Sequence, residues 1–149
     1  MKRYARLFLF LLMASGALNA QEFINMPYEK AEASLRKAYP ADSHPTVYPK
    51  KDSILVQVNN LTQLIYVFDG KGLCMTETVI TRCDSCHDGF LKTILDKKKY
   101  GWKKINENQY ISRIEDNMMI ELFPEGEIRT ISLLRADFTR EIYDLLLKQ

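Results

Sequence analysis

The feature that most constrains the fold is a pattern of one helix followed by several strands, and it occurs twice. Residues 27–81 and residues 83–135 each begin with an apolar stripe at helical spacing and continue as short alternating stretches joined by turns. When the first stretch is shifted by 55 positions, Val56 falls on Ile111, and other apolar positions and one turn also coincide. The matches lie in apolar pattern and turn position, so they predict two related units in one chain.

The first unit starts with a helix expected over residues 28–39. Pro27 suits the first position of a helix, and Pro40 is placed to end it. The stretches after it are rich in β-branched and aromatic residues and are bounded by turn residues. The strands expected in this unit are residues 53–58, 64–68 and 73–81.

The second unit has the same order. Its helix is expected to begin at Asp84 or Ser85 and to run to about Lys99, with Gly101 placed to stop it. A last helix is expected after Asp137 or Thr139, both of which are suitable capping residues. The strands expected in this unit are residues 109–114, 118–123 and 128–134.

These elements define an expected fold class. A three-stranded sheet with one apolar face needs a helix to cover it, and two such units placed edge to edge form a larger sheet. We therefore expect an α+β fold in which two helix-plus-three-strand repeats form one antiparallel sheet with the helices on one face. The repeats span about 27–81 and 83–135, a closing helix spans about 137–148, and residues 21–149 form a single domain.

The first twenty residues have the composition of an export signal. A basic start at residues 1–6 is followed by an apolar run at 7–13 and by small residues up to Ala20. The apolar run is shorter than the roughly 20 residues that span a bilayer, and no later stretch is long and apolar enough to cross one. We expect residues 1–20 to be removed and the mature chain to be periplasmic or secreted, without a membrane span.

Charge and motifs exclude several classes of function. The expected signal holds three of the 21 basic residues and none of the 19 acidic ones, so the mature chain carries a net charge of −1. The one basic cluster, Lys97–Lys99, is interpreted as a solvated helix end, so nucleic acid is not an expected partner. The sequence lacks the nucleophile elbow, the phosphate-binding loop and the zinc-protease motif. We expect no enzyme activity and no metal site.

The order of helix, three strands, helix and three strands resembles a group of small exported bacterial domains. These domains are of the beta-lactamase-inhibitor-protein-like and PepSY-like kind, and the resemblance covers most of residues 27–134. It implies a soluble module that binds another protein or serves as an accessory to one, without catalysis. We therefore expect an exported, non-enzymatic binding or accessory module whose partner is an unidentified envelope protein.

One short motif can carry chemistry. Cys83, Cys86 and His87 fit the C-x-x-C-H pattern of c-type haem attachment, in which two thiols bind the haem vinyl groups and the histidine binds the iron. The alternative function is therefore a monohaem c-type electron-transfer protein. A predominantly sheet architecture and the absence of an evident second axial ligand count against haem.

The same cysteines have other interpretations. An exported chain is expected to form disulfides, and Cys74 lies on a strand that leads toward Cys83 and Cys86, so it can pair with either of them. A redox-active Cys83–Cys86 pair at a helix start is a further alternative. A zinc site would need His44 in addition to the three residues of the motif. A structural disulfide with no cofactor is the leading interpretation.

Overall fold

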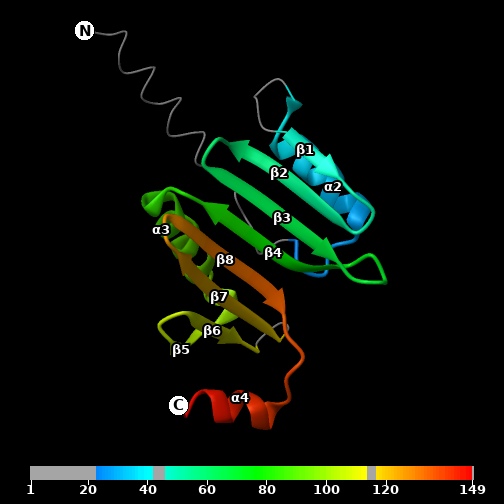
Figure 1. Cartoon of the computed structure of the whole chain (residues 1–149). Coiled ribbons are helices and arrows are strands. Elements are labelled where there is room, and N and C mark those ends of the chain that lie inside the picture. The colour runs from blue at the N-terminus through cyan, green and yellow to red at the C-terminus, as the bar shows by residue number, and fades with distance from the viewer. Residues whose placement is uncertain (1–22, 42–45, 114–116, 149) are drawn as a thin grey trace, which may run out of the picture.

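The computed structural model describes residues 23–41, 46–113 and 117–148. In this part of the chain, eight strands form one antiparallel sheet in the order β1-β2-β3-β4-β8-β7-β6-β5 (Figure 1). The helices are α2 (Tyr28–Ala38), α3 (Asp84–Leu95) and α4 (Arg140–Leu146). The strands are β1 (Thr46–Pro49), β2 (Ser53–Asn59), β3 (Thr62–Phe68), β4 (Cys74–Thr81), β5 (Lys103–Asn106), β6 (Gln109–Ser112), β7 (Met118–Glu125) and β8 (Ile128–Arg135).

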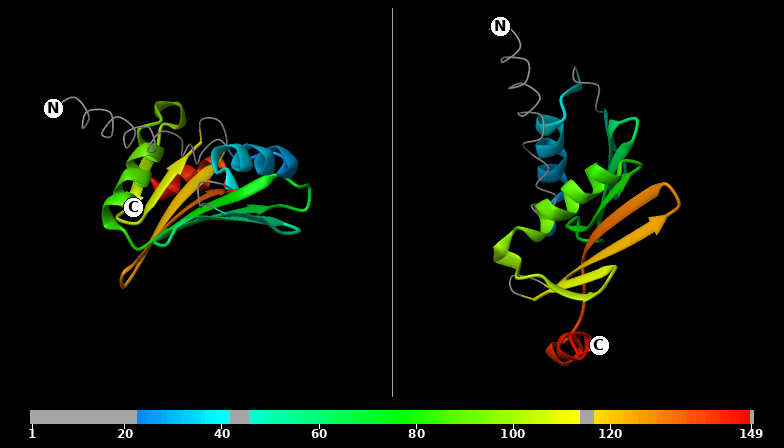
Figure 2. Two further views of the ribbon diagram at one scale, coloured as in Figure 1. Left: turned by 90° about the horizontal axis from the view of Figure 1, so that it is seen from above. Right: turned by 90° about the vertical axis from the view of Figure 1, so that its left-hand side faces the viewer.

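The sheet has helices on one face. Figure 2 shows α2 and α3 on the same side of the strands, while α4 lies beyond the end of the sheet where β5 and β6 are found. The α+β class is confirmed, although the molecule is mostly sheet. The expected count of three strands in each repeat is not confirmed, because α2 and α3 are each followed by four. The additional strands are β1 and β5, which form the two edges of the sheet.

Along the strands, buried side chains alternate with partly exposed ones, and the buried ones form the core. In β3, the side chains of Leu64, Tyr66 and Phe68 are buried, whereas those between them are partly exposed. Burial of such a row on one face of a sheet is what fixes strand register. The helices contribute Ala31 and Leu35. The other buried members of this cluster are Ile54, Val56, Cys74, Val79, Ile94, Ile120, Ile131 and Leu133.

The second helix is shorter than expected. It ends at Leu95 rather than near Lys99, and a single 3₁₀ turn, η3 (Lys98–Tyr100), follows it. Gly101 has a left-handed backbone (φ 53°) and so terminates η3 instead of α3. The earlier end allows Tyr100 to turn inward, where it is 4% exposed and its carbonyl accepts a hydrogen bond from Ser112.

Some expectations fall outside the described residues. They include the export signal at 1–20, His44, and most of the turn expected at 115–117. Among the residues that the structure describes, no helix has the length and apolar character needed to cross a membrane.

An ion pair joins the two halves of the chain near the start of α2. Asp69, in the turn between β3 and β4, pairs with Arg135 at the end of β8. Arg135 also donates a hydrogen bond of 2.6 Å to the side chain of Asn25. The hydrogen bond from Arg135, followed by one from the backbone of Leu73, lowers the pKa of Asp69 to about 2. The pair therefore joins the β3–β4 turn, the end of β8 and the segment before α2.

This pair predicts a contribution of Asp69 to acid stability. The folded pKa of about 2 lies below the unfolded value, so the stabilisation is complete above about pH 4 and disappears as the pH falls toward 2. The slope of the unfolding free energy against pH reports how many more protons the unfolded chain binds than the folded one. We expect Asp69→Asn to lower this number by up to about one in this pH window. Urea unfolding between pH 2 and 5 measures this slope. Asp96→Asn, at an exposed residue of the α3 C-terminus, is the matched control. Equal slopes for the wild type and Asp69→Asn would contradict the assignment.

Candidate functional site

The C-x-x-C-H motif lies where β4 passes into α3. Cys83 is the N-cap of α3, and its sulfur accepts a hydrogen bond of 3.1 Å from the backbone N–H of Cys86. The two cysteines form a disulfide with their Cα atoms 5.1 Å apart. Both are partly exposed, and Asp84 and Ser85 between them are exposed. The bridge therefore lies at the surface, at the positive end of a twelve-residue helix.

The interpretation in which Cys74 is bridged is wrong for this structure. Cys74 is a free, buried thiol at the first position of β4, whereas Cys83 lies two residues beyond the end of that strand at Thr81. Eight strand residues span about 25 Å, which is far more than the roughly 7 Å between Cα atoms that a disulfide allows. Burial, followed by the charge of nearby Glu77, raises the pKa of Cys74 to about 12. Cys74 is therefore an unreactive core residue.

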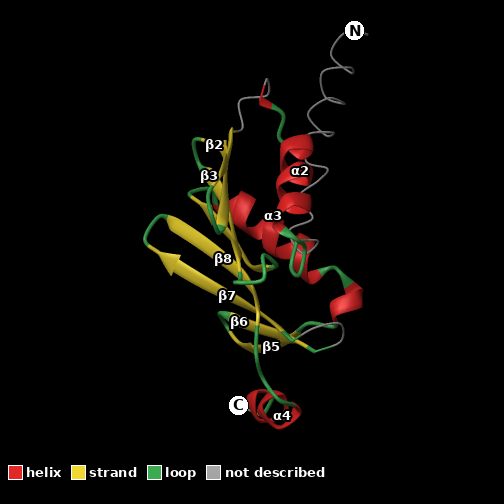
Figure 3. Ribbon diagram, turned by 90° about the vertical axis from the view of Figure 1, so that its right-hand side faces the viewer, coloured by secondary structure: helices red, strands yellow, loops and turns green. Residues whose placement is uncertain are grey.

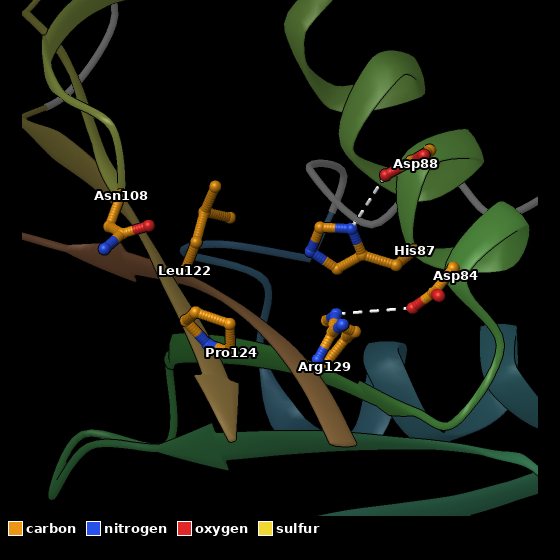
Figure 4. A pocket seen from close by; sticks show the side chains of 7 residues that line it. All are labelled: Asp84, His87, Asp88, Asn108, Leu122, Pro124 and Arg129. Atoms are coloured by element: carbon orange, nitrogen blue, oxygen red, sulfur yellow. Dashed lines mark hydrogen bonds and ion pairs between the residues drawn. The ribbon is translucent and has the colours of Figure 1, made fainter. Parts of the chain in front are cut away.

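A hollow of about 350 Å³ lies beside the motif (Figure 4). Residues Asp84, His87 and Asp88 of α3 form one wall. Residues of the second half of the sheet form the other, and the His87 imidazole points between the two walls. The residues on the sheet side are Asn108, Leu122, Pro124 and Arg129.

One ion pair and one side-chain hydrogen bond lie on the helix side of the hollow. The guanidinium of Arg129 on β8 lies 3.3 Å from the carboxylate of Asp84 and also donates to the carbonyl of Gly126. The Nδ1 atom of His87 lies 3.1 Å from a carboxylate oxygen of Asp88. Since the His87 side chain is only 14% exposed, it is held in the wall and is not a freely moving surface group. The start of α3 is thus attached to the β7–β8 hairpin.

The two thiols of the motif are not free to attach a c-type haem in this structure. The hollow combines two apolar residues, Leu122 and Pro124, with five residues that carry charged or polar groups at the ends of their carbon side chains. The two thiols that would hold the haem are joined to each other. Cys83, Cys86 and His87 are therefore together in space, as expected, with the two sulfurs bonded to each other.

The zinc set is incomplete in the described part of the chain. Cys83, Cys86 and His87 lie at one helix start, but His44 is outside the described residues. No group of three or more metal-binding side chains is found among the residues that the structure describes.

The second candidate site is the face of the sheet opposite α2 and α3. No described helix covers this face, and Figure 3 shows the strands with α2 and α3 on one side only. Its central strands carry Thr78 and Ser132, whose hydroxyl groups are 3.2 Å apart. Tyr48 on β1 and Phe123 on β7 are 49% and 44% exposed. Their strand register places both on this face, which we call the open face.

Sequence reasoning did not single out the open face. Its residues alternate with core residues, so the pattern that predicts a strand also predicts that one face can be solvated. Which face remains uncovered depends on where the helices pack, and this is a tertiary property. The aromatic residues Tyr48 and Phe123 could have indicated the open face in the sequence. They lie near strand ends, however, where aromatic residues beside a turn are common.

Comparisons with known protein families, with curated proteins and with solved structures find no match for this chain.

The cysteine arrangement predicts how many thiols react. We expect no reaction with dithionitrobenzoate in the native protein and one thiol per chain in denaturant, because Cys74 is buried and the other two cysteines are bridged. Absorbance of the released thiolate gives the count, and mass spectrometry of unreduced peptides locates the bridge. Cys74→Ala is the control and should leave no thiol under either condition. A bridge that contains Cys74, or two reactive thiols, would contradict the arrangement.

Proposed function

We propose that this protein is an exported, non-enzymatic binding or accessory module and that its open face contacts a protein of the bacterial envelope. The observation that carries the proposal is the broad sheet face that no described helix covers. Export rests on the basic and apolar composition of residues 1–20.

The side chains of the open face suit a protein contact. Polar pairs cross the strands, with Gln63 donating 2.6 Å to Gln57 and Gln109 donating 3.1 Å to Glu121. Aliphatic side chains lie between these pairs, at positions that are partly exposed in the free protein. Such a mixture of apolar area, aromatic anchors and hydrogen-bonding groups is typical of interfaces that form between separately folded proteins. The aliphatic members are Leu55, Ile65, Val67, Ile80, Met119 and Leu134.

The element order supports the resemblance to exported tandem domains. Each half has one helix followed by strands that run antiparallel, and the two halves meet through their last strands, β4 and β8. We propose that the halves are related units in which four strands, rather than three, follow each helix. The resemblance favours protein binding over catalysis, in agreement with the open face.

Photocrosslinking tests the proposed surface. We replace Phe123 with a photoreactive phenylalanine analogue in the native host and expect a discrete crosslinked product, because the ring points outward from the open face. The analogue at Ile142 on α4, which is 45% exposed, is the matched control and should give no such product. Ser132→Arg places a bulky charge at the centre of the face and should reduce the product about tenfold, equivalent to roughly 1.4 kcal/mol of binding. Denaturing gels measure the yield.

The outcomes separate the proposal from chance contact. Equal products from positions 123 and 142, or a product from 123 that Ser132→Arg leaves unchanged, would show that the open face is not the binding surface. Circular dichroism of Ser132→Arg confirms that the sheet is intact, since Ser132 is only partly buried.

The haem alternative has its own test. We expect the protein to remain colourless when it is exported in a host that attaches c-type haem, because the two thiols that would bind the haem are bridged to each other. Absorbance after denaturation detects covalent haem, and a known c-type cytochrome expressed in parallel is the positive control. A red product that keeps its pigment, and loses it in Cys83→Ala, would contradict the proposal.

A further inference from the structure

We propose that the Cys83–Cys86 bridge is a thiol–disulfide exchange site that takes electrons from a dithiol of a partner protein. The site lies at the β4–α3 junction, on the helix side of the sheet, and is separate from the open face. The proposal goes beyond the binding function and does not depend on it.

The position of the bridge in the chain is the first argument. A disulfide stabilises a fold mainly by closing a long loop in the unfolded chain, and the effect decreases as the loop shortens. Cys83 and Cys86 are separated by only three positions and lie in one helix turn, so their bridge ties no distant segments together. The helix is already attached to the sheet by Asp84 and Arg129. A bridge of this kind adds little constraint, and the fold can tolerate its opening.

The hydrogen bonds to one sulfur are the second argument. The Cys83 sulfur accepts from the backbone N–H of Cys86 and lies 3.4 Å from the hydroxyl of Ser85. A bridged sulfur carries no hydrogen, so Ser85 is the donor in that contact. Both donors lie at the N-terminus of α3, where the helix dipole favours negative charge. They favour Cys83 as a thiolate once the bridge is open, and stabilisation of the reduced form makes a disulfide more oxidising.

Access is the third argument. Both bridged cysteines are partly exposed, and the residues between them are fully on the surface. The hollow lined by His87 lies on the same helix turn and offers space for a side chain of an approaching protein. Cys74 shows the contrast, since it is buried and its sulfur donates to the carbonyl of Thr76 inside the core. The chain thus keeps one thiol unreactive and places the other two at the surface.

The reaction balances without a cofactor. A partner thiolate attacks one sulfur of the bridge, a mixed disulfide forms, and the other sulfur leaves as a thiolate that takes up a proton. The partner's second thiol then attacks the mixed disulfide and displaces the remaining sulfur. Two electrons and two protons pass from the partner dithiol to Cys83 and Cys86, and the partner's two sulfurs become joined.

Equilibration with glutathione tests whether the bridge exchanges. The purified mature protein is incubated with mixtures of reduced and oxidised glutathione, quenched in acid and alkylated, and the 83–86 peptide is measured by mass spectrometry. We expect reduced and oxidised forms to coexist within these mixtures, with an unchanged far-ultraviolet circular dichroism spectrum. A bridge that stays oxidised in every mixture, or a protein that unfolds when the bridge opens, would overturn the proposal and identify a structural disulfide.

Single-cysteine variants test which sulfur reacts. Cys86→Ser leaves Cys83 and Cys83→Ser leaves Cys86, and both are made with Cys74→Ala to remove the core thiol. With a disulfide-containing peptide at pH 6, we expect Cys86→Ser to form a mixed disulfide about tenfold faster than Cys83→Ser, because only Cys83 has the two donors. Adding Ser85→Ala to Cys86→Ser should lower its rate several-fold. Equal rates for the two single-cysteine variants would overturn the assignment of Cys83.

The net reaction gives a direct readout. The oxidised protein, mixed with a reduced peptide that has two cysteines, should yield one peptide disulfide per protein molecule, whereas the Cys83→Ser, Cys86→Ser double variant should yield none. Absence of peptide oxidation by the wild type would overturn the proposal. Photocrosslinking from position 123 is measured separately, so failure of exchange and failure of the open face as a binding surface are distinguishable.

Discussion

Pairing of β4 with β8 joins the two halves of this chain, and the other features of the fold depend on it. Six residue pairs, from Thr76 with Leu134 to Thr81 with Arg129, connect the last strand of each half in an antiparallel ladder. The pairing aligns buried Val79 with Ile131 on the helix side, so one core extends across the junction. It also brings Arg129 within reach of the start of α3 and Arg135 within reach of the β3–β4 turn. Without this ladder, each half would be a small curved sheet with one unpaired long edge.

The longer elements could be predicted because their side chains alternate over many residues. The burial of β3 and β4 follows the sequence pattern, and α2 differs from its predicted bounds by a single residue. The strands β1 and β5 are not predicted because both are short and lack alternating apolar residues. β1 ends at a proline, and β5 begins with two lysines, so neither shows the pattern of a strand. Their conformation comes from pairing with β2 and β6, which is information from the tertiary structure.

For the candidate site too, the local arrangement could be predicted from the sequence and the surroundings could not. The sequence placed Cys83, Cys86 and His87 together at a helix start, and the structure agrees. Cysteine spacing alone leaves the pairing open, although the length of the strand that begins at Cys74 argues against a bridge from that residue. The lining of the hollow could not be predicted, since Asn108 and Arg129 come from segments that follow the motif by about 20 and 40 residues in the sequence. Distant segments decide whether a short motif lies in an apolar or a polar environment.

The two short outer strands have a consequence for the behaviour of the protein at high concentration. A sheet of this size ends in backbone groups that could pair with a neighbouring molecule and start a fibre. Here one border is closed by Pro49, which offers no N–H, and the other presents the adjacent charges of Lys103 and Lys104. Pairing of a further molecule's strand with the sheet is thus disfavoured at both edges. The open face can then be accessible to another molecule without polymerisation of the protein through its edge strands.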